Sequence, residues 1–302
     1  MLIESVPSLQ TCRQAHEESR LGHLCFHVPP EAPPLGSEDF VRIAADYLSS
    51  QTHVLRAICN RGNWGVRAED LNVQLLAFVS TPCALALLGR QDRLLNETIM
   101  LARPLFERVV NLCYSVVCDE SDFAKIRDYT IQKAHEQLSR EFRAGDQVMR
   151  LYFGTKPDNT VSQNTPKQHR NSRQQWDKKI PERLGIIRQR SGATIPVFLA
   201  YQTAFYTNSS EALHGSFYGI TCHIGIYEPH EKELDSINVQ IDANETRALL
   251  LWLSGELLNE LIKVVNSEKL CSDLAEIAQN NSHACGDIVS RGLHSHHSTS
   301  PM

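Results

Sequence analysis

The sequence predicts an all-α fold, a multi-helix bundle that leaves room for a minor short β piece. Three observations carry this prediction. Apolar residues recur every three or four positions over most of the chain, helix-capping residues stand ahead of several such runs, and no series of alternating strands is present. We expect one helical domain at 37–280, between an N-terminal extension at 1–36 and a flexible, His-rich tail at 281–302.

The first expected helix begins after Ser37, whose side chain suits an N-cap, and ends at Gly62. Pro82 is expected to interrupt the second helix. Residues 155–175 are predicted to form a polar loop, and 239–242 either a short strand or a loop. Further helices are expected at about 68–80, 94–117, 121–142 and 181–189. Another is expected to begin at Pro196, and a last one, the central buried helix, to begin after Asn244.

Composition narrows the class of protein. Nine cysteines without a C-x-x-C pair, and a start without a basic and apolar leader, predict reduced thiols and a cytoplasmic location. The densest apolar run, 248–253, is far shorter than the ~20 residues that span a bilayer, so we expect no membrane association. The formal net charge of -5 disfavours a surface that coats nucleic acid as a whole. Cys and His residues between 12 and 27 match no standard zinc spacing, and we expect neither a metal nor another cofactor.

A polar stripe is predicted on the helix at 94–117. Arg103, Glu107 and Asn111 are four residues apart and therefore line one helical face, although the rest of the helix is apolar. Charges on such a helix are expected to be at least half buried, and buried charges persist only when they are paired. If Arg103 were left buried and unpaired, replacing Glu107 with Ala would cost roughly 3–5 kcal/mol.

A second polar group lies about a hundred residues later, in the helix that follows Pro196. Ser210 and His214 are one helical turn apart, and Gly215 and Ser216 follow directly. A histidine in the last turn of a helix is suited to act near neutral pH. We predict that Arg103, Glu107 and His214 lie in one polar cluster, because two polar stripes on apolar helices need mutual partners.

These motifs resemble a bacterial domain-of-unknown-function family, number five-six-seven-seven in the DUF series. The resemblance covers about 95–220 and implies a helical fold, with no established activity. The residues that carry it are Arg103, Glu107, Asn111, Trp176, Tyr206, Ser210, His214, Gly215 and Ser216.

The position of His214 near a helix end is also similar to that in HEPN-type helical RNases and toxins, whose signature places an arginine a few residues before the histidine. Here the preceding residues are Thr207, Asn208 and Ser209, so the arginine is missing. Arg103 would have to supply the guanidinium from another helix. The similarity implies metal-independent RNA cleavage in a defence or toxin context.

A basic segment precedes this helix. Between 167 and 190 the lysines and arginines exceed the acidic residues by six, with one tryptophan among them. Such a segment is typical either of a phosphate- and base-binding surface or of a solvated loop and helix face. The candidate nucleic-acid-binding residues are Lys167, Arg170, Arg173, Trp176, Lys178 and Lys179.

The hypothesis that joins these features is a protein that binds or cleaves RNA in a groove between the two polar stripes. Its candidate catalytic residues are His214, Arg103 and Glu107, and its candidate ligand-binding residues are Asn111, Tyr206, Ser210 and Ser216. The alternative is a non-enzymatic interaction or scaffolding protein in which the same residues hold helices together. A hydrolase of unknown substrate is a third possibility. The expected partners are RNA or a protein, and an oligomer is compatible with the sequence.

Overall fold

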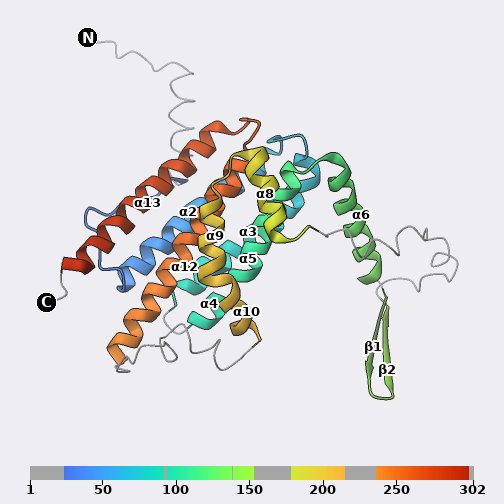
Figure 1. The fold of residues 1–302 in the computed structure, drawn as a ribbon, viewed down its shortest axis with the longest axis horizontal. Coiled ribbons are helices and arrows are strands. Elements are labelled where there is room, and N and C mark those ends of the chain that lie inside the picture. The colour runs from blue at the N-terminus through green and yellow to red at the C-terminus, as the bar shows by residue number, and fades with distance from the viewer. Residues whose placement is uncertain (1–23, 92–93, 138, 153–177, 215–235, 299–302) are drawn as a thin grey trace, which may run out of the picture.

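The computed structural model describes residues 24–91, 94–137, 139–152, 178–214 and 236–298. These residues form an all-α bundle with one two-stranded antiparallel hairpin, which confirms the predicted fold class (Figure 1). The elements are α2 (Glu38–Arg61), α3 (Ala68–Gly89), α4 (Leu95–Met100), α5 (Ala102–Val117), α6 (Glu120–Gln137), β1 (Ser139–Ala144), β2 (Gln147–Tyr152), α8 (Ile180–Ser191), α9 (Ile195–Tyr201), the π-helical turn η3 (Gln202–Tyr206), α10 (Thr207–Leu213), α12 (Ser236–Val265) and α13 (Ser272–Ser298).

Helix α12 is the centre of the bundle, and α2, α5, α9 and α13 pack around it (Figure 1). Leu257, Leu258 and Leu261 are fully buried along it. Gly255 lets α2 approach closely, because a Cβ at this position would lie 2.3 Å from Cε1 of Tyr47. The prediction that the helix around 244–262 is the central buried one is therefore correct.

The ends of α2 follow the predicted capping chemistry. Ser37 Oγ accepts a hydrogen bond from the Phe40 amide at 3.2 Å, and Gly62 ends the helix in the left-handed conformation with a φ of 68°. Both signals depend only on chain neighbours, so they can be recognised in the sequence.

Two prolines act differently from the prediction. Pro82 lies inside α3 and does not interrupt it. Phe78, Val79 and Leu85 are buried on both sides of Pro82, and their burial outweighs the loss of one helical hydrogen bond.

Conversely, the single helix expected at 94–117 is divided at Leu101 into α4 and α5. Proline at 104 has no amide to donate to the Met100 carbonyl, and the break falls within that turn.

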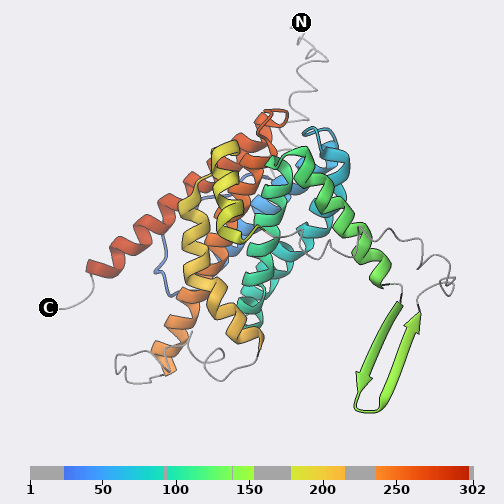
Figure 2. The same cartoon turned by 45° about the vertical axis from the view of Figure 1, so that its right-hand side comes forward.

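The helix expected at 121–142 ends at Gln137, and a hairpin follows it. Strands β1 and β2 pair from Ser139↔Tyr152 to Ala144↔Gln147 across a turn at Gly145, which has a φ of 59°. The hairpin extends away from the bundle (Figure 2). The minor β piece is thus here and not at 239–242, which belongs to α12. Asn244 does not cap that helix, because it lies inside α12; its side chain donates to the Gly36 carbonyl at 2.9 Å.

Parts of both expected terminal segments are ordered within the fold, and the tail expected to be flexible from 281 is helical as far as Ser298. Cys285 and Ile288, two residues of helix α13, are buried in the core. Asn281 holds the N-terminal segment: its Oδ1 accepts from the Phe26 amide at 2.8 Å and its Nδ2 donates to the Leu24 carbonyl at 2.9 Å. The sequence could not show this pairing, because the two segments are more than 250 residues apart.

One described helix, α3, is long and apolar enough to cross a membrane by length and composition. The apolar window within it has a mean hydropathy of 1.8, and 44% of that window is buried inside the protein. A helix that contributes to the core of a bundle meets the same criterion, so this finding by itself is weak evidence for a membrane span.

Candidate functional site

The predicted stripe on α5 forms an ion pair along the helix. Arg103 Nε donates to Glu107 Oε1 at 3.0 Å, as the four-residue spacing requires. The two side chains are 33% and 40% exposed, so the pair is more than half buried but reaches solvent. The hydrogen bond to Glu107 is the main cause that raises the pKa of Arg103, which therefore remains a cation.

The second polar group meets this pair from the other side. Arg103 Nη1 donates to Ser210 Oγ at 2.6 Å, across a separation of 107 residues. The Tyr206 hydroxyl donates to Glu107 Oε1 at 2.8 Å, and the guanidinium lies 5.1 Å from the centre of the Tyr206 ring. We call these four residues, Arg103, Glu107, Tyr206 and Ser210, the Arg103 cluster.

The π-helical turn η3 lies directly before α10 and ends at Tyr206. Its wider turn changes the angular position of the residues that follow, and such turns are frequent at functional sites. Beneath the cluster lie aromatic rings: Phe106 stacks on Tyr201 with centroids 5.8 Å apart and meets Tyr206 edge-on at 5.4 Å. Burial, followed by the hydrogen bond to Glu107, raises the pKa of Tyr206, so its hydroxyl remains a proton donor at neutral pH.

His214 lies at the exposed C-terminal end of α10, one helical turn after Ser210. Its backbone amide donates to the Ser210 carbonyl at 3.1 Å. The structure therefore brings together four of the predicted residues, and places His214 on the turn next to the serine that Arg103 contacts. No described hydrogen bond or ion pair joins the His214 side chain to Arg103 or Glu107.

Asn111 extends the polar face of α5, but its partner is one that the prediction did not single out. Its Oδ1 accepts a hydrogen bond from Arg183 Nη1 of α8. Burial lowers the pKa of Arg183, while the charges of Tyr114 and Glu107 act in the opposite direction. In the sequence, Arg183 is recognisable only as one of the cations of the basic segment. Its contact with Asn111 could not be predicted, because it depends on how α8 packs against α5.

Tyr114 ends this polar face and belongs to a separate network. Its hydroxyl donates to Asp122 Oδ2 at 2.7 Å, and Lys178 forms an ion pair with the same carboxylate. The hydrogen bond from Lys178 is the largest cause that lowers the pKa of Asp122. Lys178, predicted to bind nucleic acid, therefore forms an ion pair within the protein, whereas Lys179 is exposed.

Five other predicted site residues lie outside the described part of the chain. They are Lys167, Arg170, Arg173 and Trp176 of the basic segment, and Ser216.

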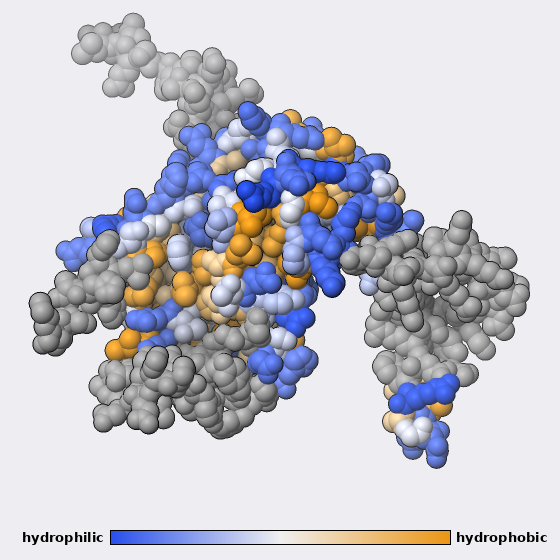
Figure 3. Space-filling model, in the orientation of Figure 1, coloured by the Kyte–Doolittle hydropathy of each residue, from blue (hydrophilic) through white to orange (hydrophobic). Residues whose placement is uncertain are grey.

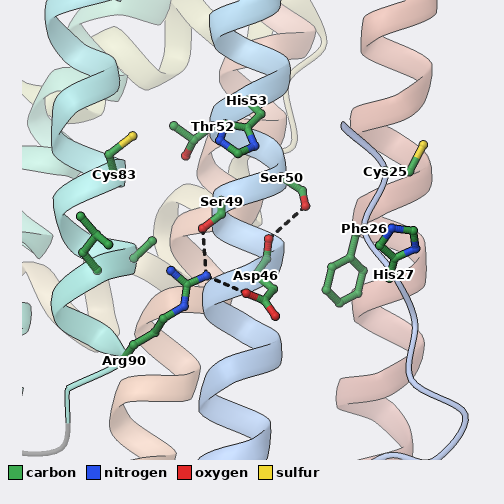
Figure 4. A pocket seen from close by; sticks show the side chains of 12 residues that line it. Cys25, Phe26, His27, Asp46, Ser49, Ser50, Thr52, His53, Cys83 and Arg90 are labelled. Carbon is green, nitrogen blue, oxygen red and sulfur yellow. Dashed lines mark hydrogen bonds and ion pairs between the residues drawn. The ribbon is translucent and has the colours of Figure 1, made fainter. Parts of the chain in front are cut away.

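A separate cavity of about 530 Å³ lies between α2, the end of α3 and the N-terminal segment. Figure 4 shows Arg90 reaching across it to Asp46 and Ser49, at 2.6 Å and 3.3 Å. Cys25, His27, His53 and Cys83 also line it, but the described residues contain no group of three or more side chains that could hold a metal ion. The sequence carried no signal for this cavity, because its lining comes from three separate segments.

Comparison of the chain with protein-family models, with curated proteins and with solved structures found no match. The resemblances described above therefore remain predictions from the motifs.

Proposed function

We propose that the protein binds and cleaves RNA at the solvent-reaching Arg103 cluster, with His214 as the proton-transfer group. The observation that supports this most is the hydrogen bond from Arg103 to Ser210, one helical turn before His214. An arginine from α5 thereby comes close to the histidine-bearing turn, although no arginine precedes His214 in the local sequence. The proposal thus assigns to Arg103 the guanidinium that the HEPN-like signature requires.

The proposed reaction is a metal-independent transesterification. The RNA 2′-hydroxyl attacks the neighbouring phosphorus, and the bond from phosphorus to the 5′-oxygen breaks. The products are a 2′,3′-cyclic phosphate and a free 5′-hydroxyl. His214 takes the proton from the attacking 2′-hydroxyl and returns it to the departing 5′-oxygen. The permanently charged guanidinium of Arg103 stabilises the charge that develops on the phosphoryl oxygens. Glu107 and Tyr206 orient that guanidinium through the contacts described above.

A second cation on the face of α5 that carries Arg103 supports phosphate binding, because Arg183 contacts Asn111 there. Lys179 and Arg188 are exposed at the two ends of α8, which packs against α5. Because the net charge of the whole chain is -5, binding of RNA would depend on this local concentration of positive charge.

The test is incubation of the protein with a mixed RNA pool, followed by analysis of the product ends. We expect cleavage that leaves 2′,3′-cyclic phosphate, and a loss of roughly 10²–10⁴-fold in rate for His214→Gln at an unchanged melting temperature. His283→Gln is the matched control, because His283 is also an exposed helical histidine and lies on α13. Wild-type protein that leaves every RNA intact would contradict the proposal.

A second candidate is a non-enzymatic interaction protein, and one specific observation favours it. Glu107 Oε1 accepts hydrogen bonds from both Arg103 and Tyr206, while Arg103 also donates to Ser210. These contacts fasten η3 and α10 to α5 without any ligand. In that case the RNA pool remains intact, and Arg103→Gln lowers the melting temperature.

A further inference from the structure

Helix α3 has an apolar side that the bundle does not use. Leu71, Leu75 and Phe78 are buried in the core, and α3 packs mainly against α2, α4, α5 and α12. Away from the core, Val73 is 72% exposed, and Leu87, which also lines the cavity beside α2, is 63% exposed. Exposed apolar side chains that continue along one helix face mark an interaction surface.

These outward residues follow a heptad pattern. Val73, Ala77, Ser80, Ala84 and Leu87 are spaced by four, three, four and three residues, and each is exposed or partly exposed. We call this set the α3 seam. An alternating spacing of four and three is the pattern by which one helix packs along another, and within the described part of the chain no second helix lies on it.

We propose that the α3 seam binds the α3 seam of a second copy of this chain, with the two helices antiparallel around a two-fold axis at Ser80. This inference does not rest on the proposed RNA activity. In this register Val73 of each copy lies opposite Leu87 of the other, and the small residues Ala77, Ser80 and Ala84 let the two backbones approach closely.

Charge complementarity favours the antiparallel arrangement. The same register places Asp70 of each copy opposite Arg90 of the other, so both ends of the pair bring opposite charges together. Asp70 already lies 3.8 Å from Arg127, and Arg90 lies 2.6 Å from Asp46, but their side chains remain 43% and 32% exposed. Each therefore keeps surface for a further partner. A parallel pair would instead place Asp70 against Asp70.

The composition of the seam favours a second protein helix over a lipid surface. Helices that lie on membranes present large apolar side chains flanked by lysine and arginine. The centre of the α3 seam consists of small residues, and Glu69 and Asp70 make its beginning acidic. An anionic lipid surface would repel that end.

Sedimentation equilibrium of the full chain tests the proposal. One pair of 22-residue helices makes a small interface, and we expect a dimer with a dissociation constant of about 1–100 µM. Val73→Glu should weaken the dimer at least about tenfold, because it buries a charge at the interface. Leu199→Glu is the matched control: Leu199 is 50% exposed on α9, away from α3, and its replacement should leave the dimer unchanged. Figure 3 shows apolar surface over the part of the molecule where α8 and α9 lie.

Oxidative crosslinking tests the register. Ser80→Cys lies on the proposed axis, so two copies should form a disulfide dimer that wild-type protein does not form. Gln74→Cys is also exposed on α3 but lies off the seam, and it should remain uncrosslinked. A chain that stays monomeric at about 200 µM would overturn the proposal, whether or not it binds vesicles. So would a dimer that persists in Val73→Glu and fails to crosslink through Ser80→Cys.

Discussion

Arg103 and Arg247 form two clusters of similar composition in very different surroundings. Arg103 bonds a carboxylate and a hydroxyl while its side chain is 33% exposed. Arg247, on the central helix α12, is fully buried and donates to the Glu38 carboxylate, to the Asn244 side chain and to the Gly89 carbonyl. Both form hydrogen bonds to distant parts of the chain, and they differ in access to water.

That difference separates a structural role from one open to ligands. A buried arginine has no route to a substrate, and its hydrogen bonds hold α12 against the start of α2 and the end of α3. A partly exposed arginine loses less free energy when a partner is removed, because water replaces the partner. Arg103 can therefore exchange an internal contact for water or, in the proposed function, for a phosphate, whereas the buried Arg247 has no such access.

The largest loss of folding stability is expected when the buried arginine, Arg247, is replaced. Arg247→Ala should lower the free energy of unfolding by about 3–5 kcal/mol, because it opens a cavity and removes the cation that bonds Glu38, Asn244 and the Gly89 carbonyl. Urea denaturation followed by circular dichroism measures it. A loss below about 1 kcal/mol would show that the two clusters do not differ as burial suggests.

A smaller loss of folding stability is expected when Glu107 of the partly exposed Arg103 cluster is replaced. Glu107→Ala should cost about 1–2 kcal/mol, well below the roughly 3–5 kcal/mol anticipated for a buried arginine, because solvent reaches Arg103. Glu107→Gln keeps an acceptor for Tyr206 and should cost less than the alanine variant. The same urea titration compares the two, and equal losses for Ala and Gln would contradict the role of the two accepted hydrogen bonds.

The smallest effect is expected in the pH dependence of the Tyr114 network. The folded state lowers the pKa of Asp122, chiefly through the hydrogen bond from Lys178. A carboxyl whose folded pKa lies below its unfolded value of about 3.9 contributes stability above pH ~4. That contribution is lost as the pH falls through the folded pKa. The stability difference between wild type and Asp122→Asn should therefore shrink below pH ~4, and a difference independent of pH from about 2 to 7 would contradict it.

The local elements of this fold were the most predictable. Ser37 and Gly62 are recognisable caps, and the four-residue spacing of Arg103 and Glu107 places them on one face of any helix. The sequence does not predict the hairpin at 139–152, because helical spacing through Leu138 extends the expected helix to 142, into strand β1. The bounds of α13 were missed because a polar, His-rich composition resembles a tail, although Cys285 and Ile288 are buried.

By itself the sequence determined the helical class, most helix positions and the polar faces, because these depend on a period of about 3.6 residues and on neighbours along the chain. The tertiary structure alone decided which polar faces meet. Ser210 contacts Arg103 across 107 residues, and Arg247 is buried while Arg103 is not. Such contacts depend on the packing of all helices together, and the pattern of any single segment contains no information about its distant partner.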